Sequence, residues 1–301
     1  MRYLGIDIGG TFIKYALINE DMRIQYKWKK ETRIFNDKDS FYDYICEDLL
    51  ENDFVLVGVS APGVIKDHTV ISKTGPTTCI MYHTNIEREI QARIHASTYV
   101  MNDAKAAAYC EYHLGASKNT TSSAYLIIGT GLGGCSIEDG VIKEGRDHLA
   151  GEFSCLPFSV SSGRIITAAH FASMSALIEI YNKFSRDPVK YGDEVCRRYL
   201  ENEKSAIWAM NDWILNIAAI LINVSLTYNP DVICIGGGIS EETWFFELLS
   251  QTFMKYFPPR FEPLLTTKIV PCHYGNDANL IGPILYGREK LEQCSNLESL
   301  K

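Results

Sequence analysis

The stretch that decides the fold is YLGIDIGGTFIKYALI, residues 3–18. It reads as two apolar strands joined by a glycine-rich turn. Asp7 places a carboxylate inside the first strand, and Gly9, Gly10 and Thr11 follow almost at once. A buried charge is costly unless it has a partner, and glycines allow a ligand to approach the main chain closely. The alternative is a satisfied acid beside an ordinary tight turn.

A second stretch repeats this pattern. Residues 125–137, YLIIGTGLGGCSI, again contain an apolar strand, a Gly/Thr-rich turn and a second apolar strand. We interpret the repeat as an internal structural duplication, with two lobes that meet near residues 115–123. Leading strands followed by alternating helices and strands are typical of a mixed α/β unit. At 301 residues the chain is long enough for two lobes, each with its own core.

Composition and charge exclude several classes of function. The chain is 46% apolar and 22% charged with a net charge of −8, which argues against a dedicated nucleic-acid or anionic-membrane binder. No apolar run approaches the roughly 20 residues of a membrane helix, and the sequence enters its first strand without a signal peptide. The nine cysteines include no C-x-x-C pair, so we expect reduced thiols in a cytoplasmic protein and no zinc site.

Three glycine-rich turns each follow an apolar strand. They are Gly9-Gly10-Thr11, Gly129-Thr130-Gly131 and Gly236-Gly237-Gly238. Three such turns in two duplicated lobes predict a divided nucleotide cradle, in which main-chain N–H groups and threonine hydroxyls meet phosphate oxygens. Asp7 would then find its missing partner in a Mg²⁺ ion, reached directly or through water.

Other phosphate-binding motifs fit less well. GTGLGG, residues 129–134, satisfies G-x-G-x-x-G, but the dinucleotide-binding fingerprint needs a helix directly afterwards, whereas a hairpin strand is expected here. The sequence contains neither G-x-x-x-x-G-K-[ST] nor H-R-D-x-x-x-x-N. These absences exclude a P-loop and a protein-kinase fold.

Asn102 and Asp103 lie at a predicted strand-to-helix junction. An aspartate there can simply cap the helix. It can also act as a carboxylate that takes a proton from a substrate hydroxyl, because a rigid scaffold holds it in place. A second Asn-Asp-Ala at residues 276–278 shows that the tripeptide alone is not specific, so the surrounding VMNDAKAAAYCE carries the functional interpretation.

Six segments resemble, in order and spacing, the motifs of the ROK family of sugar kinases: GIDIGGTFIKYAL, GVSAPGVI, VMNDAKAAAYCE, IIGTGLGGCSI, AGEF and DVICIGGGIS. The resemblance covers nearly the whole chain. It implies an actin-like, hexokinase-type fold, a duplicated ribonuclease H-like architecture with two lobes around a cleft. We expect a small lobe at residues 1–116 with a C-terminal helix of about 287–301 returning to it, and a large lobe at 117–286.

The resemblance also implies an activity and its residues. Members of the family use ATP and Mg²⁺ to phosphorylate a sugar hydroxyl, usually at C6, and are often homodimers. The first phosphate motif matches Asp7, Gly9, Gly10 and Thr11; the second matches Gly129, Thr130 and Gly131; the adenosine turn matches Gly236, Gly237 and Gly238. The sugar ligands match Asn102, Asp103 and Glu152, with Asp103 as the base, and the sugar-side loop matches Ala61, Pro62 and Gly63.

The chain departs from the family pattern after Glu152. Typical members read G-E-[IL]-G-H and then a cysteine cluster that holds structural zinc, whereas this chain reads AGEFSCLPFSVSSGR over residues 150–164. One cysteine cannot build a tetrahedral zinc site, so no structural zinc is expected. The segment resembles the zinc-lacking branch that includes β-glucoside kinases. His148 is either a substitute sugar ligand or a loop residue.

Two alternatives to a kinase are a sugar-responsive repressor and a catalytically inactive sugar-binding or sensing protein. A repressor of this family carries an N-terminal helix-turn-helix, for which the strand pattern from residue 2 onward leaves no room. The altered segment after Glu152 keeps the inactive sugar-binding protein open. The identity of the sugar is also open: glucose, mannose, fructose, N-acetylmannosamine and β-glucosides all fit.

Overall fold

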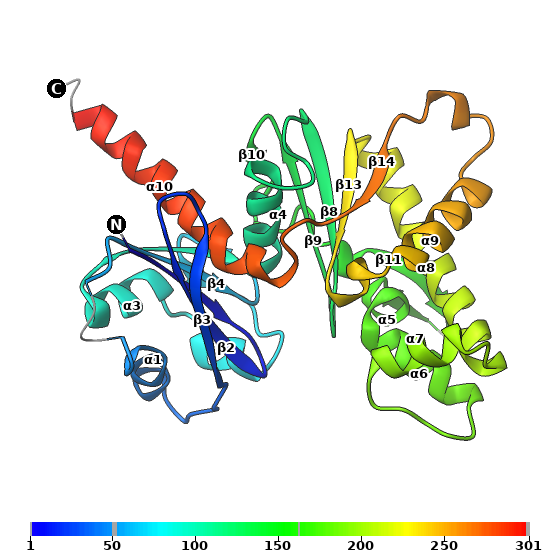
Figure 1. Cartoon of the computed structure of the whole chain (residues 1–301), viewed down its shortest axis with the longest axis horizontal. Helices are drawn as coiled ribbons and strands as arrows, with labels where there is room; N and C mark the ends of the chain where they lie inside the picture. Colours follow the sequence, from blue (N-terminus) through cyan, green and yellow to red (C-terminus); the bar gives the residue numbers. More distant parts are fainter. Residues whose placement is uncertain (1, 50–52, 162, 299–301) are drawn as a thin grey trace. The chain divides into compact units, whose positions relative to one another are not determined.

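The computed structural model describes residues 2–49, 53–161 and 163–298, and its contacts divide the chain into two units. Unit 1 comprises residues 1–115, 144–149 and 276–301, and unit 2 comprises residues 116–143 and 150–275. Each unit has its own sheet, and each is described by itself below (Figure 1).

Unit 1 is built on a mixed sheet with the strand order β3-β2-β1-β4-β7. Its strands are β1 (Tyr3–Ile8), β2 (Phe12–Ile18), β3 (Ile24–Glu31), β4 (Leu56–Ala61) and β7 (Ser97–Asn102), with the small pair β5 (Ile65–Lys66) and β6 (Thr69–Val70). Its helices are α1 (Lys38–Cys46), α2 (Pro76–Met81), α3 (Ile86–Ile94), α4 (Asp103–His113) and α10 (Ala278–Glu298), with the short turn η4 (Gly275–Asp277) at the junction with unit 2. All six residues of β1 and of β4 are buried, as expected of central strands.

The C-terminal helix α10 packs on unit 1 through glycines. A Cβ atom on Gly5 of β1 would lie 2.5 Å from the carbonyl oxygen of Leu280, and one on Gly58 of β4 would lie 2.6 Å from the nitrogen of Ile284. A Cβ atom on Gly282 of α10 would collide with the backbone of α4. These glycines therefore let the helix approach both the sheet and α4 at backbone distance.

Unit 2 repeats the topology of unit 1, with the strand order β10-β9-β8-β13-β14. Its strands are β8 (Ser122–Ile128), β9 (Leu132–Glu138), β10 (Val141–Ile142), β13 (Val232–Gly236) and β14 (Lys268–Pro271). In both sheets a central strand pairs antiparallel with the following strand and parallel with the next crossover strand. The predicted internal duplication is confirmed by this shared order.

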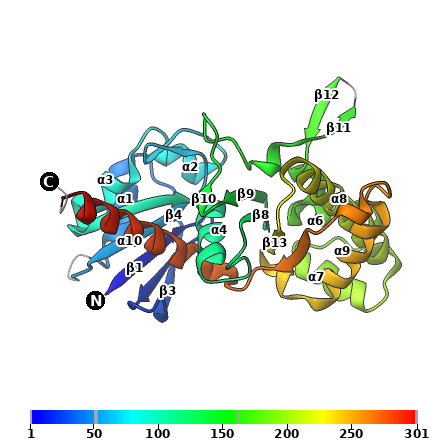
Figure 2. The same ribbon diagram turned by 90° about the horizontal axis from the view of Figure 1, so that it is seen from above.

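The remaining elements of unit 2 cover its sheet or project from it. They are α5 (Ala169–Ala172), α6 (Met174–Phe184), α7 (Gly192–Leu200), α8 (Lys204–Tyr228) and α9 (Thr243–Tyr256), the hairpin β11 (Pro157–Ser161) and β12 (Arg164–Thr167), and the short turns η1 (Phe153–Cys155), η2 (Gly238–Glu241) and η3 (Glu262–Leu264). Figure 2 shows the β11–β12 hairpin standing away from the helices.

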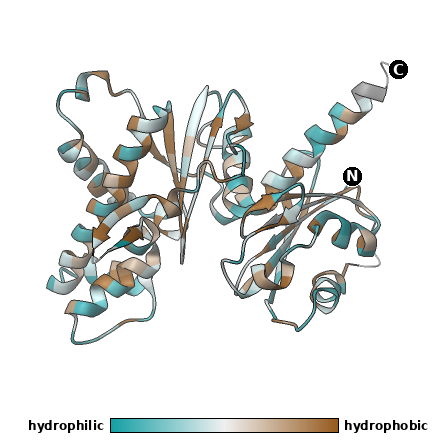
Figure 3. Ribbon diagram, turned by 180° about the vertical axis from the view of Figure 1, so that it is seen from behind, coloured by the Kyte–Doolittle hydropathy of each residue, from teal (hydrophilic) through white to brown (hydrophobic). Residues whose placement is uncertain are grey.

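Helix α8 is the central core helix of unit 2. Its length and composition would allow it to cross a membrane, but half of its most apolar window is buried inside the protein. Trp213 lies fully buried in this helix, and its indole N–H donates to the carbonyl oxygen of Ser173 at 2.9 Å. Figure 3 shows hydrophobic and hydrophilic residues mixed along such helices, which place one face against the core.

The first boundary between the units lies close to the expected one, whereas the second does not. Unit 1 first ends at residue 115, where a boundary at 116 is predicted, but it resumes at residue 276 instead of about 287. The reason is that α10 is one continuous helix from Ala278, with its first turns already packed on β1 and α4. Residues 299–301 of the expected C-terminal helix lie outside the described residues.

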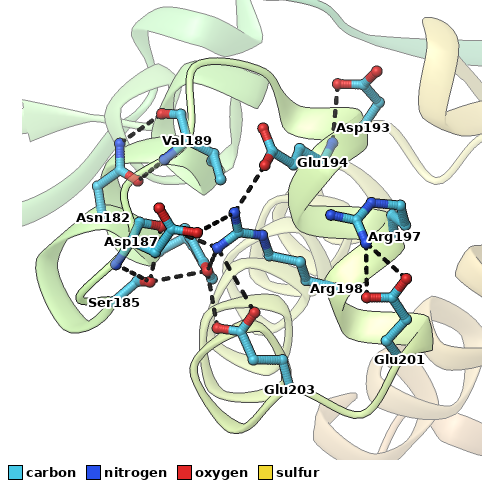
Figure 4. Close-up of polar contacts among 11 residues, drawn as sticks. Asn182, Ser185, Asp187, Val189, Asp193, Glu194, Arg197, Arg198, Glu201 and Glu203 are labelled. Atoms are coloured by element: carbon cyan, nitrogen blue, oxygen red, sulfur yellow. Dashed lines mark hydrogen bonds and ion pairs between the residues drawn. The ribbon is translucent and has the colours of Figure 1, made fainter.

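A polar cluster holds the connection between α6 and α7 (Figure 4). The guanidinium of Arg198 lies 2.7 Å from Asp187 and 2.8 Å from Glu194, and it donates to the hydroxyl of Tyr181. Tyr181 is fully buried, and its hydroxyl donates to Glu203 at 2.9 Å. One arginine thus joins α6, the connection, α7 and the start of α8, with planar geometry suited to several acceptors.

We expect Arg198→Ala to lower the melting temperature of the protein by several degrees, because it leaves the buried Tyr181 hydroxyl and two carboxylates without their common donor. The matched control is Arg197→Ala on the same helix. Arg197 makes an ion pair with Glu201 at 2.7 Å in which both side chains are more than half exposed, and such pairs contribute little. Differential scanning calorimetry compares the two variants, and equal losses would contradict the role given to Arg198.

Candidate active site

In unit 1, the predicted site residues lie at the carboxyl ends of adjacent parallel strands. Asp7 of β1 pairs in register with Ser60 of β4, and Ala61 of β4 pairs with Asn102 of β7. Asp103 follows directly as the first residue of α4. The structure therefore brings Asp7, the Ala61-Pro62-Gly63 loop and the Asn102-Asp103 pair to one edge of the sheet. This edge is where open α/β sheets bind ligands.

Asp7 already has protein partners. Its side chain is buried, with Oδ1 accepting from the hydroxyl of Ser60 at 2.6 Å and from the amide of Asn279 at 3.4 Å. Oδ2 lies 3.1 Å from the ammonium of Lys14. Of the two interpretations of Asp7, the satisfied acid is confirmed, and a role toward Mg²⁺ stays a prediction. A signal for Lys14 was present in the sequence, because the tight turn sets a hairpin register in which Lys14 stands opposite Asp7.

The turn after β1 holds its own carbonyl oxygens. The N–H of Gly9 donates to the carbonyl oxygen of Phe12 at 3.1 Å, which closes the turn. Thr32 donates from its hydroxyl to the carbonyl oxygen of Gly9 at 2.8 Å and from its N–H to that of Thr11 at 2.9 Å. A Cβ atom on the exposed Gly10 would meet open space. The turn therefore offers bare main chain with two of its carbonyl groups directed into the protein.

Asn102 links the loop after β4 to Asp103 at this edge. Its amide donates to the carbonyl oxygen of Gly63 at 3.0 Å and to Oδ1 of Asp103 at 2.9 Å. Its own Oδ1 accepts the N–H of Lys105 at 3.2 Å, so Asn102, not Asp103, is the N-cap of α4. Oδ1 of Asp103 also accepts the N–H of Ala104 at 2.8 Å. These bonds orient the Asp103 carboxylate and confirm its predicted place at a helix N-terminus.

In unit 2, the turn after β8 is built in the same way as the turn after β1. The carbonyl oxygen of Gly129 accepts from the N–H of Met174 at 2.9 Å, and that of Thr130 accepts from the hydroxyl of Ser175 at 2.7 Å. The carbonyl oxygen of Gly131 accepts from the N–H of Gly129 at 3.0 Å. All three turn residues are exposed, and a Cβ atom on either glycine would meet open space.

The third glycine turn follows the neighbouring parallel strand β13. Gly237 has φ +95°, and a Cβ atom there would collide with the carbonyl oxygen of Ile128 at the end of β8. The carbonyl oxygen of Gly237 accepts from both the N–H and the hydroxyl of Ser240, at 2.9 and 2.7 Å. The turns after β8 and β13 lie so close together that only glycine fits at position 237. Gly236 and Gly238 are its neighbours in the chain.

Glu152 is held by packing against β9. A Cβ atom on Gly134 would collide with the carbonyl oxygen of Gly151 and with the ring of Phe153. Gly151 has φ +85°, and Phe153 is almost fully buried. The last glycine of GTGLGG therefore makes room for the Glu152 segment. The prediction that a strand follows this motif, in place of the helix of a dinucleotide fold, is confirmed by β9.

His148 and Cys155 are the other residues singled out near Glu152. His148 belongs to the segment Glu144–Leu149 of unit 1, and its Nδ1 lies 3.2 Å from Oε2 of Glu144. Cys155 is exposed at the end of η1. Within residues 2–49, 53–161 and 163–298, no group of three or more His, Cys, Asp or Glu side chains could hold a metal ion. The absence of a structural zinc stays a prediction.

The glycine turn of each unit has room for a phosphate group, and in unit 1 Asp7 is the residue that could hold a hydrated Mg²⁺ ion. The glycine turns expose main chain while their carbonyl oxygens are bound within the protein, which removes repulsion toward phosphate oxygens. Mg²⁺ keeps several waters and needs only one or two carboxylates in addition to substrate phosphates. The carboxylate of Asp7 has about four lone-pair positions, so its partners leave capacity for a water on the ion.

These sheets and turns define a two-lobed, actin-like sugar-kinase fold. A glucokinase from Streptomyces griseus, solved with glucose and AMPPNP, superimposes with a TM-score of 0.82 at 22% identity, covering 96% of this chain and all of that one. The ROK family profile matches residues 3–289. The chain belongs to the ROK family.

Curated relatives cover most of this chain. An uncharacterised protein from Clostridium perfringens is 31% identical over 270 residues, covering 83% of this chain and 86% of its own length. The β-glucoside kinase of Listeria innocua is 27% identical over 293 residues, covering 95% of this chain and 97% of its own length. The second of these relatives is named as a sugar kinase.

We expect Lys14→Met to lower the free energy of unfolding by about 1–3 kcal/mol, because Asp7 then keeps its charge in a buried position without a cation. The figure lies below that for a fully buried pair because the Lys14 side chain is 38% exposed. The Asp7→Asn/Lys14→Met double variant should recover part of the loss, and urea unfolding of both single variants and the double variant measures the coupling. Additive losses would mean that the two side chains do not interact.

Proposed function

We propose that this protein phosphorylates a sugar hydroxyl with ATP and Mg²⁺, most simply the C6 hydroxyl of a hexose, an amino sugar or a β-glucoside. The observation that carries the proposal is the site edge of unit 1. There Asn102 joins the sugar-side loop to an oriented Asp103, next to a glycine turn with tied carbonyl oxygens. Sugar kinases among the relatives support the same class of reaction.

Asp103 is the proposed general base. The sugar binds through Asn102, Asp103 and Glu152, with the Ala61-Pro62-Gly63 loop beside it. As the hydroxyl oxygen attacks the γ-phosphorus of ATP, a new O–P bond forms, the bond to ADP breaks, and the hydroxyl proton passes to the Asp103 carboxylate. The two hydrogen bonds to Oδ1 keep the carboxylate in one orientation during this transfer.

The glycine turns are the proposed phosphate and adenosine sites. Main chain around Gly10 and Gly131 meets charge on the transferred group, and the turn at Gly236-Gly237-Gly238 receives the adenosine. When bound, Mg²⁺ neutralises phosphate charge, and Asp7 is the residue that would hold it, directly or through water. Positioning and electrostatic stabilisation supply most of the acceleration in such a reaction.

An inactive sugar-binding or sensing protein is the second candidate. The altered segment after Glu152 favours it, because the His and cysteine cluster of typical members are missing there. For either function we expect a cytoplasmic homodimer that binds neither nucleic acid nor membrane, consistent with the net charge of −8.

We expect Asp103→Asn to fold normally, to bind ATP, and to lose about 10²-fold or more in kcat, the scale of a lost general base. Asparagine keeps the shape and one acceptor oxygen for the N–H of Ala104 but cannot take a proton. Steady-state kinetics with a saturating sugar measures the loss, and circular dichroism controls for folding. Wild-type turnover in this variant would show that another group is the base.

A coupled ADP-release assay against a panel of sugars tests the function itself. We expect turnover with at least one hexose, amino sugar or β-glucoside, abolished by EDTA and restored by excess Mg²⁺, with the phosphorylated carbon identified by NMR. Calorimetric sugar binding without turnover for any member of the panel would instead support the inactive sugar-binding protein.

A further inference from the structure

A buried lysine stands in the first turn of α4. Lys105 is 4% exposed, and its ammonium lies 2.8 Å from Oε1 of Glu144. Two effects disfavour a lysine at this position: burial removes the hydration of the ammonium, and the positive end of the helix dipole repels a cation. A lysine that is kept in spite of both its burial and the helix dipole is expected to have a structural or functional role.

Glu144, the partner of Lys105, lies on a short segment that belongs to unit 1. Glu144–Leu149 makes its contacts within unit 1, although the chain on both sides of it belongs to unit 2. Oε2 of Glu144 also lies 3.2 Å from Nδ1 of His148, but that nitrogen makes no hydrogen bond, so Lys105 is the firm partner of Glu144. A second attachment, Lys66 with Asp147, is longer at 4.0 Å and exposed on both sides.

The ion pair of Lys105 and Glu144 is therefore the buried attachment of this segment to α4. Surface pairs such as the one at Asp147 contribute little, whereas a pair with one deeply buried member is strongly orienting, because the buried charge has few alternative partners. The lysine is fixed in turn by its helix, whose first turn is capped by Asn102 through the N–H of Lys105 itself.

We propose that Lys105 and Glu144 are positioning residues that fix the segment Glu144–Leu149 on the helix that carries the proposed base. Only two residues separate this segment from Glu152, so fixing the segment limits the positions that the Glu152 carboxylate can reach. The inference rests on the proposed function, in which Glu152 is a sugar ligand. It makes the ion pair a determinant of sugar affinity and leaves the affinity for ATP unaffected.

Lys105→Met tests this proposal, because methionine fills the buried space of the lysine stem without its charge. Removing one member of an ion pair is costly when the other stays buried, but Glu144 is 39% exposed and can be hydrated after its partner is removed. We expect the KM for the sugar to rise about 10-fold or more, because the segment that leads to Glu152 is then no longer fixed on α4, with the KM for ATP and the melting temperature near wild-type values. Hydrogen exchange of the segment Glu144–Leu149 should become faster.

Lys143→Met is the matched control, since Lys143 directly precedes the segment and forms an exposed ion pair with Glu138 at 2.7 Å. It should change neither the exchange rates nor the sugar KM. Unchanged exchange of the segment in Lys105→Met overturns the positioning role. Faster exchange with an unchanged sugar KM overturns the link to the sugar.

The test also separates this proposal from the failure of the proposed function. If the wild-type protein transfers no phosphoryl group, the sugar Kd from calorimetry replaces the KM, and the same 10-fold weakening is expected. If the protein binds no sugar of the panel, the proposed function and the sugar-related part of this inference both fail, whereas the exchange measurement still decides whether the ion pair holds the segment.

Discussion

The glycine turns of this protein depend on one constraint: carbonyl oxygens in each turn are bound by donors of the same unit. Thr32 binds two carbonyl groups of the turn after β1, and Met174 and Ser175 bind two of the turn after β8. A peptide group with its oxygen fixed inward has its N–H side directed elsewhere, which is the arrangement that anion sites use. The two turns share no partner residues, yet they reach the same result.

Asp7, the buried acid of β1, has its polar partners within the protein. Lys14, Ser60 and Asn279 together satisfy Asp7 before any ligand arrives, so the fold does not need a cation for stability. Removing either charge of such a pair costs more than the pair itself contributes. A phosphate ligand near Asp7 would compete for Lys14, and a hydrated cation would replace part of its charge. The ion pair with Lys14 and the hydrogen bonds from Ser60 and Asn279 thus hold the Asp7 carboxylate in place within unit 1.

Much of this site could be predicted from the sequence, and the limits are physical. The strands, the glycine turns and the helix start at Asn102 follow from local patterns, because turn chemistry and capping act over a few residues. The helix over residues 276–287 was also predictable, but its place in unit 1 was not, since glycines on β1 and β4 create its packing surface from the other end of the chain. The return of Glu144–Leu149 to unit 1 is invisible for the same reason: it depends on a buried lysine of α4.

The sequence after Glu152 differs from the family pattern, but the backbone around Glu152 is closely packed. By the family resemblance, typical members fix this region with a histidine and a zinc cluster. Here the backbone around Glu152 is held by the fit of Gly151 and Phe153 against Gly134, and the following residues form the β11–β12 hairpin. Close packing against a strand restrains a main chain as firmly as a metal ligand restrains a side chain, because any shift creates overlap or a void. The backbone on both sides of Glu152 is therefore restrained within unit 2 without the zinc residues of typical members.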